Sequence, residues 1–442
     1  MKTILVTGST GFLGSNLIRR LSGEGYRILA LVRNKGGILL RRTPDNGGWD
    51  RFLNEGGNRE HLEGVELVQG DITLPLLGLP SRRFRRLAWQ VDAIFHSAAL
   101  TDFTNRTHLF RTNVEGTRHL LQFALLGRKK HFHHISSAYV AGKFIGTFCE
   151  EDFNKNQGFN NSYEESKFNS ETMVRRFARE HLLPFTIYRP SIIVGDSETG
   201  RTQCYKGFYA FARALFLLKE QALKRHGSYS GVCGGVLSCL RQIRRGEQYT
   251  PAIKEKATPV EIPMRIFGAP DALINLVPVD YVAEAISEIA KRPEAQGMTF
   301  HLTNPHPLTL AQLTDKTSQA LGIEGVEPWY QDDGVVGTGL DGDLNPASQS
   351  HAKLSPTERL FLRHTRPYAP YLQSRLSFDT SNTMNVLNGT VTCPKITRSL
   401  VSLLIDRAVE DRWGMREAVP PPADEEVALA MMVGDSACGV AR

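Results

Sequence analysis

The sequence predicts an α/β protein with a doubly wound parallel β-sheet and a mostly helical C-terminal lobe. Three observations support this fold class. Short apolar runs without turn residues alternate with segments of helical periodicity, as expected for successive strand–helix units. The first of these strands leads directly into a glycine-rich turn and a helix. Beyond residue 200 the alternation stops, and longer helical segments follow.

Each element is predicted from its own pattern. Apolar runs predict strands at residues 3–6, 27–32, 65–69, 91–96, 131–135, 185–190 and 299–303. Helical spacing of apolar residues predicts helices at 13–21, 162–180, 208–218, 308–321 and 356–372, and one that ends near 290. Polar and glycine-rich composition predicts a surface insertion at 34–62 and a mobile loop at 331–352. The tail from 419, which begins with prolines, is predicted to be disordered.

The turn after the first strand carries Gly8, Gly11 and Gly14 at three-residue intervals. A missing side chain permits a tight turn at the first, approach of a pyrophosphate at the second and close helix–strand packing at the third. The helix N-terminus then presents N–H groups to phosphates. The motif therefore predicts a dinucleotide site, with a glycine-rich turn of another α/β protein as the alternative. Its predicted cofactor contacts also include Thr7, Thr10, Phe12 and Leu13.

Arg33 closes the second strand, where dinucleotide folds read the adenosine ribose. An acidic residue there binds the 2′-hydroxyl of NAD, whereas an arginine accommodates the 2′-phosphate of NADP. We therefore predict NADPH rather than NAD, with Arg41 or Arg42 as further contacts; a solvated arginine is the alternative. Asp71 and Ile72 follow the third strand. The carboxylate of Asp71 is predicted to accept a hydrogen bond from the adenine amino group, unless it serves only the turn.

Residues after the fourth and sixth strands are predicted to line the same cofactor. Ala98 and Ala99 are small enough for a cofactor to pass close to the backbone. Pro190, Ser191 and Ile193 are predicted to form a wall beside the nicotinamide.

Tyr163 and Lys167 are four residues apart on a predicted helix and therefore share one face. An ammonium beside a phenol favours the phenolate, so we expect the pKa of Tyr163 to fall from about 10 toward working pH. Tyr163 would then serve as a proton donor or acceptor. Ser137 closes the fifth strand and adds a hydroxyl to this candidate catalytic set.

The glycine motif, Asp71, Asn113, Ser137, Tyr163 and Lys167 together resemble the extended short-chain dehydrogenase/reductase family over residues 1–310. The stretches 70–79, 95–99, 136–140 and 275–282 look like its thioester reductase and fatty acyl-CoA reductase branch, which is male sterility-like. The resemblance implies a Rossmann fold and NADPH-dependent reduction of acyl thioesters to aldehyde or alcohol. It implies Ser137, Tyr163, Lys167 and Asn113 as catalytic residues, and an acyl group delivered on CoA or on a separate carrier protein.

On this basis we predict four regions. Residues 1–200 form the NADP-binding domain, and 201–330 form a substrate-binding insertion together with returning Rossmann elements. Residues 331–418 form a C-terminal helical cover, and 419–442 form the disordered tail. The same Ser-Tyr-Lys set also serves sugar-nucleotide epimerases or dehydratases and ketone or hydroxysteroid reductases, which are the first alternative function. A non-catalytic NADPH sensor is the second, although a sensor needs no proton relay.

The composition is that of an ordinary globular protein, with 442 residues and a net charge of +7. The basic excess lies at 33–42 and 201–245 without interleaved aromatic residues, so we expect no nucleic-acid partner. A phosphorylated cofactor or an anionic carrier explains these patches as well. Arg241, Arg244 and Arg245 are candidate contacts for the phosphates of CoA or a carrier, or else a solvated face.

No apolar run reaches the roughly 18 residues needed to span a membrane, and the N-terminus reads as a strand rather than a signal peptide. We therefore expect a cytoplasmic protein, with a homodimer as an open option. For the apolar segment 208–218 we consider three roles: lining an acyl channel, contacting a membrane peripherally, or packing as a core helix. No metal site is expected, because the six cysteines lack paired spacing and His131, His133 and His134 alternate between faces without an acidic partner.

Overall fold

The computed structural model describes residues 1–33, 64–101, 103, 105–225, 259–330 and 354–415. Several predictions fall outside these residues. They concern the insertion at 34–62, the loop at 331–352, the tail at 419–442, and the side chains of Arg41, Arg42, Cys233, Cys239, Arg241, Arg244, Arg245 and Cys438.

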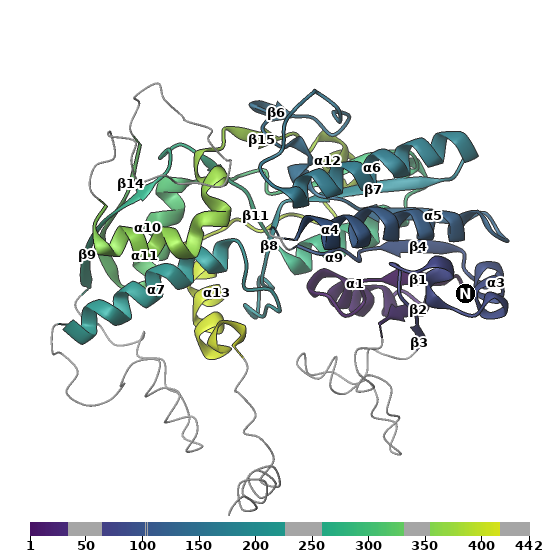
Figure 1. The fold of residues 1–442 in the computed structure, drawn as a ribbon, viewed down its shortest axis with the longest axis horizontal. Coiled ribbons are helices and arrows are strands. Elements are labelled where there is room, and N and C mark those ends of the chain that lie inside the picture. Colours follow the sequence, from purple (N-terminus) through teal and green to yellow (C-terminus); the bar gives the residue numbers. More distant parts are fainter. Residues whose placement is uncertain (34–63, 102, 104, 226–258, 331–353, 416–442) are drawn as a thin grey trace, which may run out of the picture.

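A seven-stranded parallel sheet forms the centre of one half of the molecule (Figure 1). Its strands lie in the order β12-β7-β5-β4-β1-β2-β3. Their bounds are β1 Thr3–Thr7, β2 Arg27–Val32, β3 Val65–Gln69, β4 Ala93–His96, β5 His131–Ile135, β7 Phe185–Pro190 and β12 Thr299–Leu302. The strand order reverses between β1 and β4, which creates a crevice at the carboxyl ends of these strands.

Helices cover both faces of this sheet because its strands are apolar on both sides. The flanking helices are α1 Phe12–Ser22, α3 Ser81–Gln90, α5 Gly116–Leu125, α6 Ser162–His181 and α9 Val279–Ala290. α1 and α9 pack on the face to which Ile4 and Val6 point, and α3, α5 and α6 pack on the face to which Leu5 points. The predicted doubly wound sheet is therefore confirmed.

A second, mostly helical lobe lies beside the sheet, on the left in Figure 1. Its main elements are α7 Phe208–Arg225, β9 Val260–Phe267, α10 Leu310–Leu321, β14 Ile323–Trp329, α11 Pro356–Thr365 and α13 Arg398–Glu410. β9 and β14 pair in parallel, and the helices enclose an apolar core of their own. Tyr209, Ala212 and Leu215 of α7 are buried in this core, so residues 208–218 are a core helix rather than a membrane contact.

Short strand pairs connect distant parts of the chain. They are β6 Gly146–Phe148 with β15 Leu376–Phe378, β8 Ile192–Val194 with β11 Leu276–Pro278, and β10 Leu273–Ile274 with β13 Leu308–Thr309. Glu150 follows β6 and is buried. Its carboxylate accepts hydrogen bonds from the backbone N–H groups of Asn382 at 2.5 Å and Thr383 at 3.2 Å. Because these lie at the start of α12 (Ser381–Leu387), Glu150 fixes the C-terminal segment to the sheet.

No helix in the described ranges combines the length and the hydropathy that a membrane crossing requires.

Candidate active site

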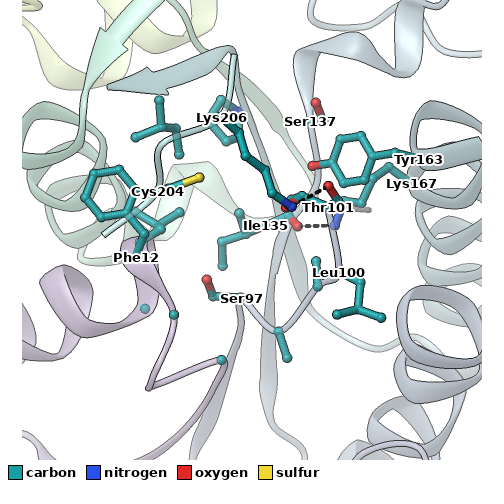
Figure 2. A pocket seen from close by; sticks show the side chains of 18 of the residues that line it. Phe12, Ser97, Leu100, Thr101, Ile135, Ser137, Tyr163, Lys167, Cys204 and Lys206 are labelled. Atoms are coloured by element: carbon teal, nitrogen blue, oxygen red, sulfur yellow. Dashed lines mark hydrogen bonds between the residues drawn. The ribbon is translucent and has the colours of Figure 1, made fainter. Parts of the chain in front are cut away.

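A cavity of about 560 Å³ lies at the carboxyl ends of β1, β4 and β5. Figure 2 shows Phe12 and Cys204 on one side of it and Ser137 and Tyr163 on the other. Most residues that the sequence singles out line this cavity, namely Thr7, Gly8, Thr10, Gly11, Phe12, Leu13, Gly14, Arg33, Ile72, Ala98, Ala99, Ser137, Tyr163, Lys167, Pro190, Ser191 and Ile193.

The glycine turn forms a cradle that side chains would fill. Gly8 has φ +69°, and a Cβ added there would lie 2.6 Å from the backbone nitrogen of Ala98. A Cβ on Gly14 would overlap the carbonyl oxygen of Gly8. The first turn of α1 has neither a side-chain cap nor an acidic residue, so its N–H groups remain for an anion. The turn therefore fits the pyrophosphate of a dinucleotide.

We expect Gly14→Ala to weaken NAD(P)H binding at least about tenfold and to lower the melting temperature by several degrees, because overpacking of this kind costs about 1–3 kcal/mol. Fluorescence titration with NADPH and with NADH, together with thermal unfolding, measures the two effects. Gly23→Ala is the matched control, since Gly23 has φ −66° and its added Cβ meets its first neighbour, the Arg20 carbonyl oxygen, at 3.5 Å. Wild-type affinity in Gly14→Ala would contradict the cradle.

Lys167 and Tyr163 both come from the first part of α6, and Ser137 follows β5. Lys167 is buried, and its Nζ donates a hydrogen bond to the carbonyl oxygen of Ile135 at 2.6 Å (Figure 2). The Tyr163 hydroxyl points toward Ser137 in the same view. α6 begins at the N-cap Asn161, whose Oδ1 accepts a hydrogen bond from the Glu164 N–H at 3.0 Å. This cap fixes the turn that carries Tyr163.

The prediction that Lys167 lowers the pKa of Tyr163 is wrong. Burial raises the pKa of Tyr163 to about 12, although the Ser137 hydroxyl opposes the shift. The ammonium of Lys167 is bound to the Ile135 carbonyl, and burial lowers the pKa of Lys167 itself to about 8. Tyr163 is therefore a neutral phenol at neutral pH, which is the form that donates a hydrogen bond to a developing oxyanion.

Asn113 lies outside the cavity wall. It is buried in the short π-helix η4 (Arg111–Glu115), which joins α4 (Arg106–Phe110) to α5. Its Oδ1 accepts from the Leu100 N–H at 2.8 Å, and its Nδ2 donates to the Leu100 carbonyl at 3.1 Å and to Ser166 Oγ at 2.9 Å. Asn113 thus holds the loop after β4 against α6, and a catalytic role for it stays a prediction.

His96 at the end of β4 supports the same region, and the sequence analysis did not single it out. Its Nδ1 and Nε2 each lie 2.9 Å from a threonine hydroxyl, those of Thr7 and Thr117. Thr117 in turn donates to the Asn113 carbonyl at 2.6 Å. Burial lowers the pKa of His96 to about 3, so the imidazole is neutral and links the ends of β1 and β4 to η4.

Arg33 and Asp71 differ in their relation to the cavity. Arg33 is exposed and lines it at the end of β2. Asp71 does not line the cavity. Its Oδ1 accepts hydrogen bonds from the N–H and the hydroxyl of Thr73, both at 2.8 Å. Asp71 therefore stabilises the turn after β3, which was the alternative to a contact with the adenine. Its neighbours Gly70 and Ile72 line the cavity wall. A contact of Asp71 with the adenine stays a prediction.

Part of the wall was not predicted from the sequence. It includes Phe103, Tyr139, Cys204, Lys206, Tyr368 and Tyr371. The Phe103 ring lies 6.1 Å from that of Tyr163 and 5.7 Å from that of Tyr368. Lys206 Nζ donates to the carbonyl oxygen of Thr101 at 2.9 Å, linking the two lobes (Figure 2). The three-residue spacing of Tyr368 and Tyr371 within a predicted helical segment is the one signal that points to a shared face.

Cys149, Cys204 and Cys393 are free thiols. His131 and His133 stack at 4.2 Å, and His134 lies on the other face of β5, next to His96. Within the described ranges, no three or more His, Cys, Asp and Glu side chains form a group that could hold a metal ion.

Residues 6–225 match the protein family described as male sterility protein. The chain is 28% identical over 334 residues to isonitrile lipopeptide synthase of Mycobacterium tuberculosis, covering 69% of this chain and 12% of that protein. It is 26% identical over 335 residues to carboxylic acid reductase of Segniliparus rugosus, covering 69% of this chain and 24% of that protein. This chain therefore spans a quarter or less of each of these two relatives.

A solved structure supports the same relationship over almost the whole chain. The terminal R domain from the myxalamid PKS-NRPS biosynthetic pathway superposes with a TM-score of 0.68 at 26% identity, covering 95% of this chain and 92% of that one. The matching region contains the glycine cradle, Ser137, Tyr163 and Lys167. The chain, through residues 6–225, therefore belongs to the male sterility NAD-binding branch of the extended short-chain dehydrogenases/reductases and is an NAD(P)-dependent oxidoreductase.

Proposed function

We propose that the protein reduces acyl thioesters with NADPH to an aldehyde or an alcohol. One observation carries this proposal: a single cavity joins the dinucleotide cradle to Ser137, Tyr163 and Lys167 and to a wall that includes four aromatic rings. Those rings belong to Phe103, Tyr139, Tyr368 and Tyr371 and offer apolar contact to an acyl group. The likeness to a carboxylic acid reductase and to a terminal R domain supports the reaction class.

The nicotinamide of the bound cofactor supplies the hydride, and the protein's own groups stabilise the charge that develops. The Tyr163 and Ser137 hydroxyls donate hydrogen bonds to the carbonyl oxygen of the thioester as it becomes an oxyanion. Lys167 donates a hydrogen bond to the Ile135 carbonyl, and its proposed role is to bind the cofactor ribose. Collapse of the oxyanion breaks the C–S bond, the thiolate takes a proton, and an aldehyde leaves. Reduction of the aldehyde to the alcohol would require exchange of the oxidised cofactor for a second NADPH, with the Tyr163 hydroxyl as the proton donor to the alkoxide.

The proposed substrate carries its acyl group on CoA or on a carrier protein. Lys206 lines the cavity as a cation on the side of the second lobe and offers a positive charge to an anionic carrier. The likeness to a lipopeptide synthase and to a PKS-NRPS domain supports a carrier-bound acyl group. A cytoplasmic location and a homodimer stay predictions.

Arg33 is proposed to select NADPH through the 2′-phosphate. We expect Arg33→Asp to raise the KM for NADPH about tenfold or more and to leave that for NADH nearly unchanged, because a charge-assisted hydrogen bond to phosphate is lost. Steady-state kinetics with the two cofactors measure the effect. Arg27→Ala is the control, since Arg27 stands at the other end of β2 and pairs with Glu66 at 2.8 Å. Equal loss for both cofactors would contradict the proposed contact.

The deciding experiment follows NADPH oxidation with a short panel of substrates: long-chain acyl-CoA, an acyl carrier thioester, a free aldehyde and a UDP-sugar. Oxidation with a thioester supports the proposal, and product analysis then separates aldehyde from alcohol. Oxidation with the aldehyde alone would make the protein a carbonyl reductase. Silence on the whole panel with NADPH still bound would favour the epimerase or dehydratase alternative, which consumes no NADPH, or the sensor, and analysis of the UDP-sugar product would separate these two.

A further inference from the structure

Tyr371 reaches from the C-terminal part of the chain to the helix that carries Tyr163. It lies on η8 (Arg366–Gln373), and its hydroxyl donates a hydrogen bond to Oε1 of Glu164 at 2.6 Å. Nδ2 of Asn161 donates to the same hydroxyl at 2.8 Å. Asn161 is the N-cap of α6 and Glu164 is the third residue of its first turn. Tyr371 therefore binds both sides of the turn that contains Tyr163.

The Glu164 carboxylate depends on these partners because the side chain is fully buried, with 0% of the residue exposed. Its Oε2 accepts a hydrogen bond from the Asn160 N–H at 2.7 Å, and Tyr371 provides the short contact to Oε1. Buried carboxylates persist where hydrogen bonds satisfy them. Oε1 also accepts a hydrogen bond from Asn160 Nδ2 at 3.3 Å, so loss of the Tyr371 hydroxyl removes the shorter of its two hydrogen bonds in the turn that positions Tyr163.

Tyr371 also packs against the neighbour of the second catalytic hydroxyl. Its ring meets that of Tyr139 edge to face, with centroids 5.0 Å apart and an interplanar angle of 82°. The Tyr139 N–H donates to Ser137 Oγ at 3.2 Å. One side chain of the C-terminal segment thus contacts residues that hold both Tyr163 and Ser137.

We propose that Tyr371 and Glu164 form a positioning pair, which sets Tyr163 and Ser137 in their reactive geometry and makes the site depend on docking of η8. This inference rests on the proposed function, in which Tyr163 donates to the oxyanion. Tyr371 acts through Glu164 and the first turn of α6.

Glu164 also acts on Tyr163 through its charge. Burial is the main cause of the raised pKa of Tyr163, and the Glu164 carboxylate and the Cys204 thiol raise it further while Ser137 lowers it. The titratable groups that face Glu164 are Tyr371 from η8, Lys143 from the segment before β6, and Tyr139 from η5 (Ala138–Ala141). Removing the Glu164 charge should therefore lower the pKa of Tyr163 and move the basic limb of the pH–rate profile to lower pH.

The test compares Tyr371→Phe, Glu164→Gln and the double variant with wild type in the full-length protein. Tyr371→Phe keeps the ring packed on Tyr139, and Glu164→Gln keeps an acceptor for Tyr371. We expect kcat in Tyr371→Phe to fall about 10- to 100-fold with the KM for NADPH within about twofold, because small displacements of reacting groups have effects of this size. The double variant should be no slower than the slower single variant, since the two residues act as one unit.

Hydrogen exchange of the amides of residues 162–166 supplies a readout that needs no substrate. We expect it to be about tenfold faster in Tyr371→Phe, because the opening of a local turn depends on its tertiary contacts. Tyr330→Phe is the matched control, since Tyr330 is 39% exposed and lies outside the cavity wall. Unchanged exchange in Tyr371→Phe, or additive losses in the double variant, would overturn the inference. If wild type turned over no thioester, the proposed function would fail while exchange still decided the role of Tyr371.

Discussion

Replacement of Tyr163 by phenylalanine is expected to lower kcat for the proposed thioester reduction by about 10²- to 10⁴-fold, the usual contribution of a positioned proton donor. The ring stays in place, so its contact with Phe103 remains and only the hydroxyl is lost. Affinity for NADPH should change by less than about twofold, because the glycine cradle and Lys167 are untouched. Single-turnover NADPH oxidation and a separate binding titration measure the two quantities.

Tyr26→Phe is a suitable control for this variant. Tyr26 packs beside the core that α1 and α9 form, and it does not line the cavity. Its replacement should leave turnover unchanged. Wild-type turnover in Tyr163→Phe would remove Tyr163 from the mechanism and with it the proposed reaction.

Glu171→Leu is expected to lower the free energy of unfolding by about 3–5 kcal/mol, the usual effect of leaving one partner of a buried ion pair alone. Glu171 and Arg189 are both fully buried, and Arg189 donates to the two carboxylate oxygens at 2.6 and 3.1 Å. Ser136 donates to the same carboxylate at 2.7 Å. Urea unfolding of the full-length protein measures the loss. The exposed pair of Arg176 and Glu180 on the same helix is the control, and Glu180→Ala should change stability by less than about 0.5 kcal/mol.

The loss in Glu171→Leu should depend on pH in a defined direction. Burial alone would raise the pKa of Glu171, but Arg189 and Arg175 outweigh it and hold the pKa at about 2. A lowered pKa in the folded state gives stability that is complete above the unfolded value of about 4.3 and is lost as the pH falls toward 2. The difference between wild type and variant should therefore shrink over that interval. A difference that stays constant with pH would contradict ionisation of Glu171 as the cause.

The strands and the dinucleotide cradle could be predicted because their signals are local. β2, β3, β5 and β7 have the predicted bounds, since each is a short segment in the alternation of strands and helices, although β5 contains three histidines. The glycine motif is likewise contained in one turn, and the structure brings its residues to the cavity.

The far wall of the cavity could not be predicted in this way. Tyr368 and Tyr371 are contributed by a segment that follows about two hundred residues after Tyr163, and only the folded chain brings them together. The predicted fall in the pKa of Tyr163 was wrong for a related reason. Spacing places Lys167 on the same helix face, but burial and the Ile135 carbonyl decide the pKa, and both depend on tertiary structure.

The pairing of β6 with β15 has a consequence for the way in which the protein is made. Thr147 and Ser377, whose hydroxyls lie 2.9 Å apart, are separated by 230 positions in sequence. Contacts of such long range raise the contact order and slow folding. A ribosome must synthesise the chain through β15 and α12 before β6 gains its partner and Glu150 gains its backbone donors. Phe148 therefore lacks its neighbour Leu376, and β6 its partner strand, until the last quarter of the chain has been synthesised.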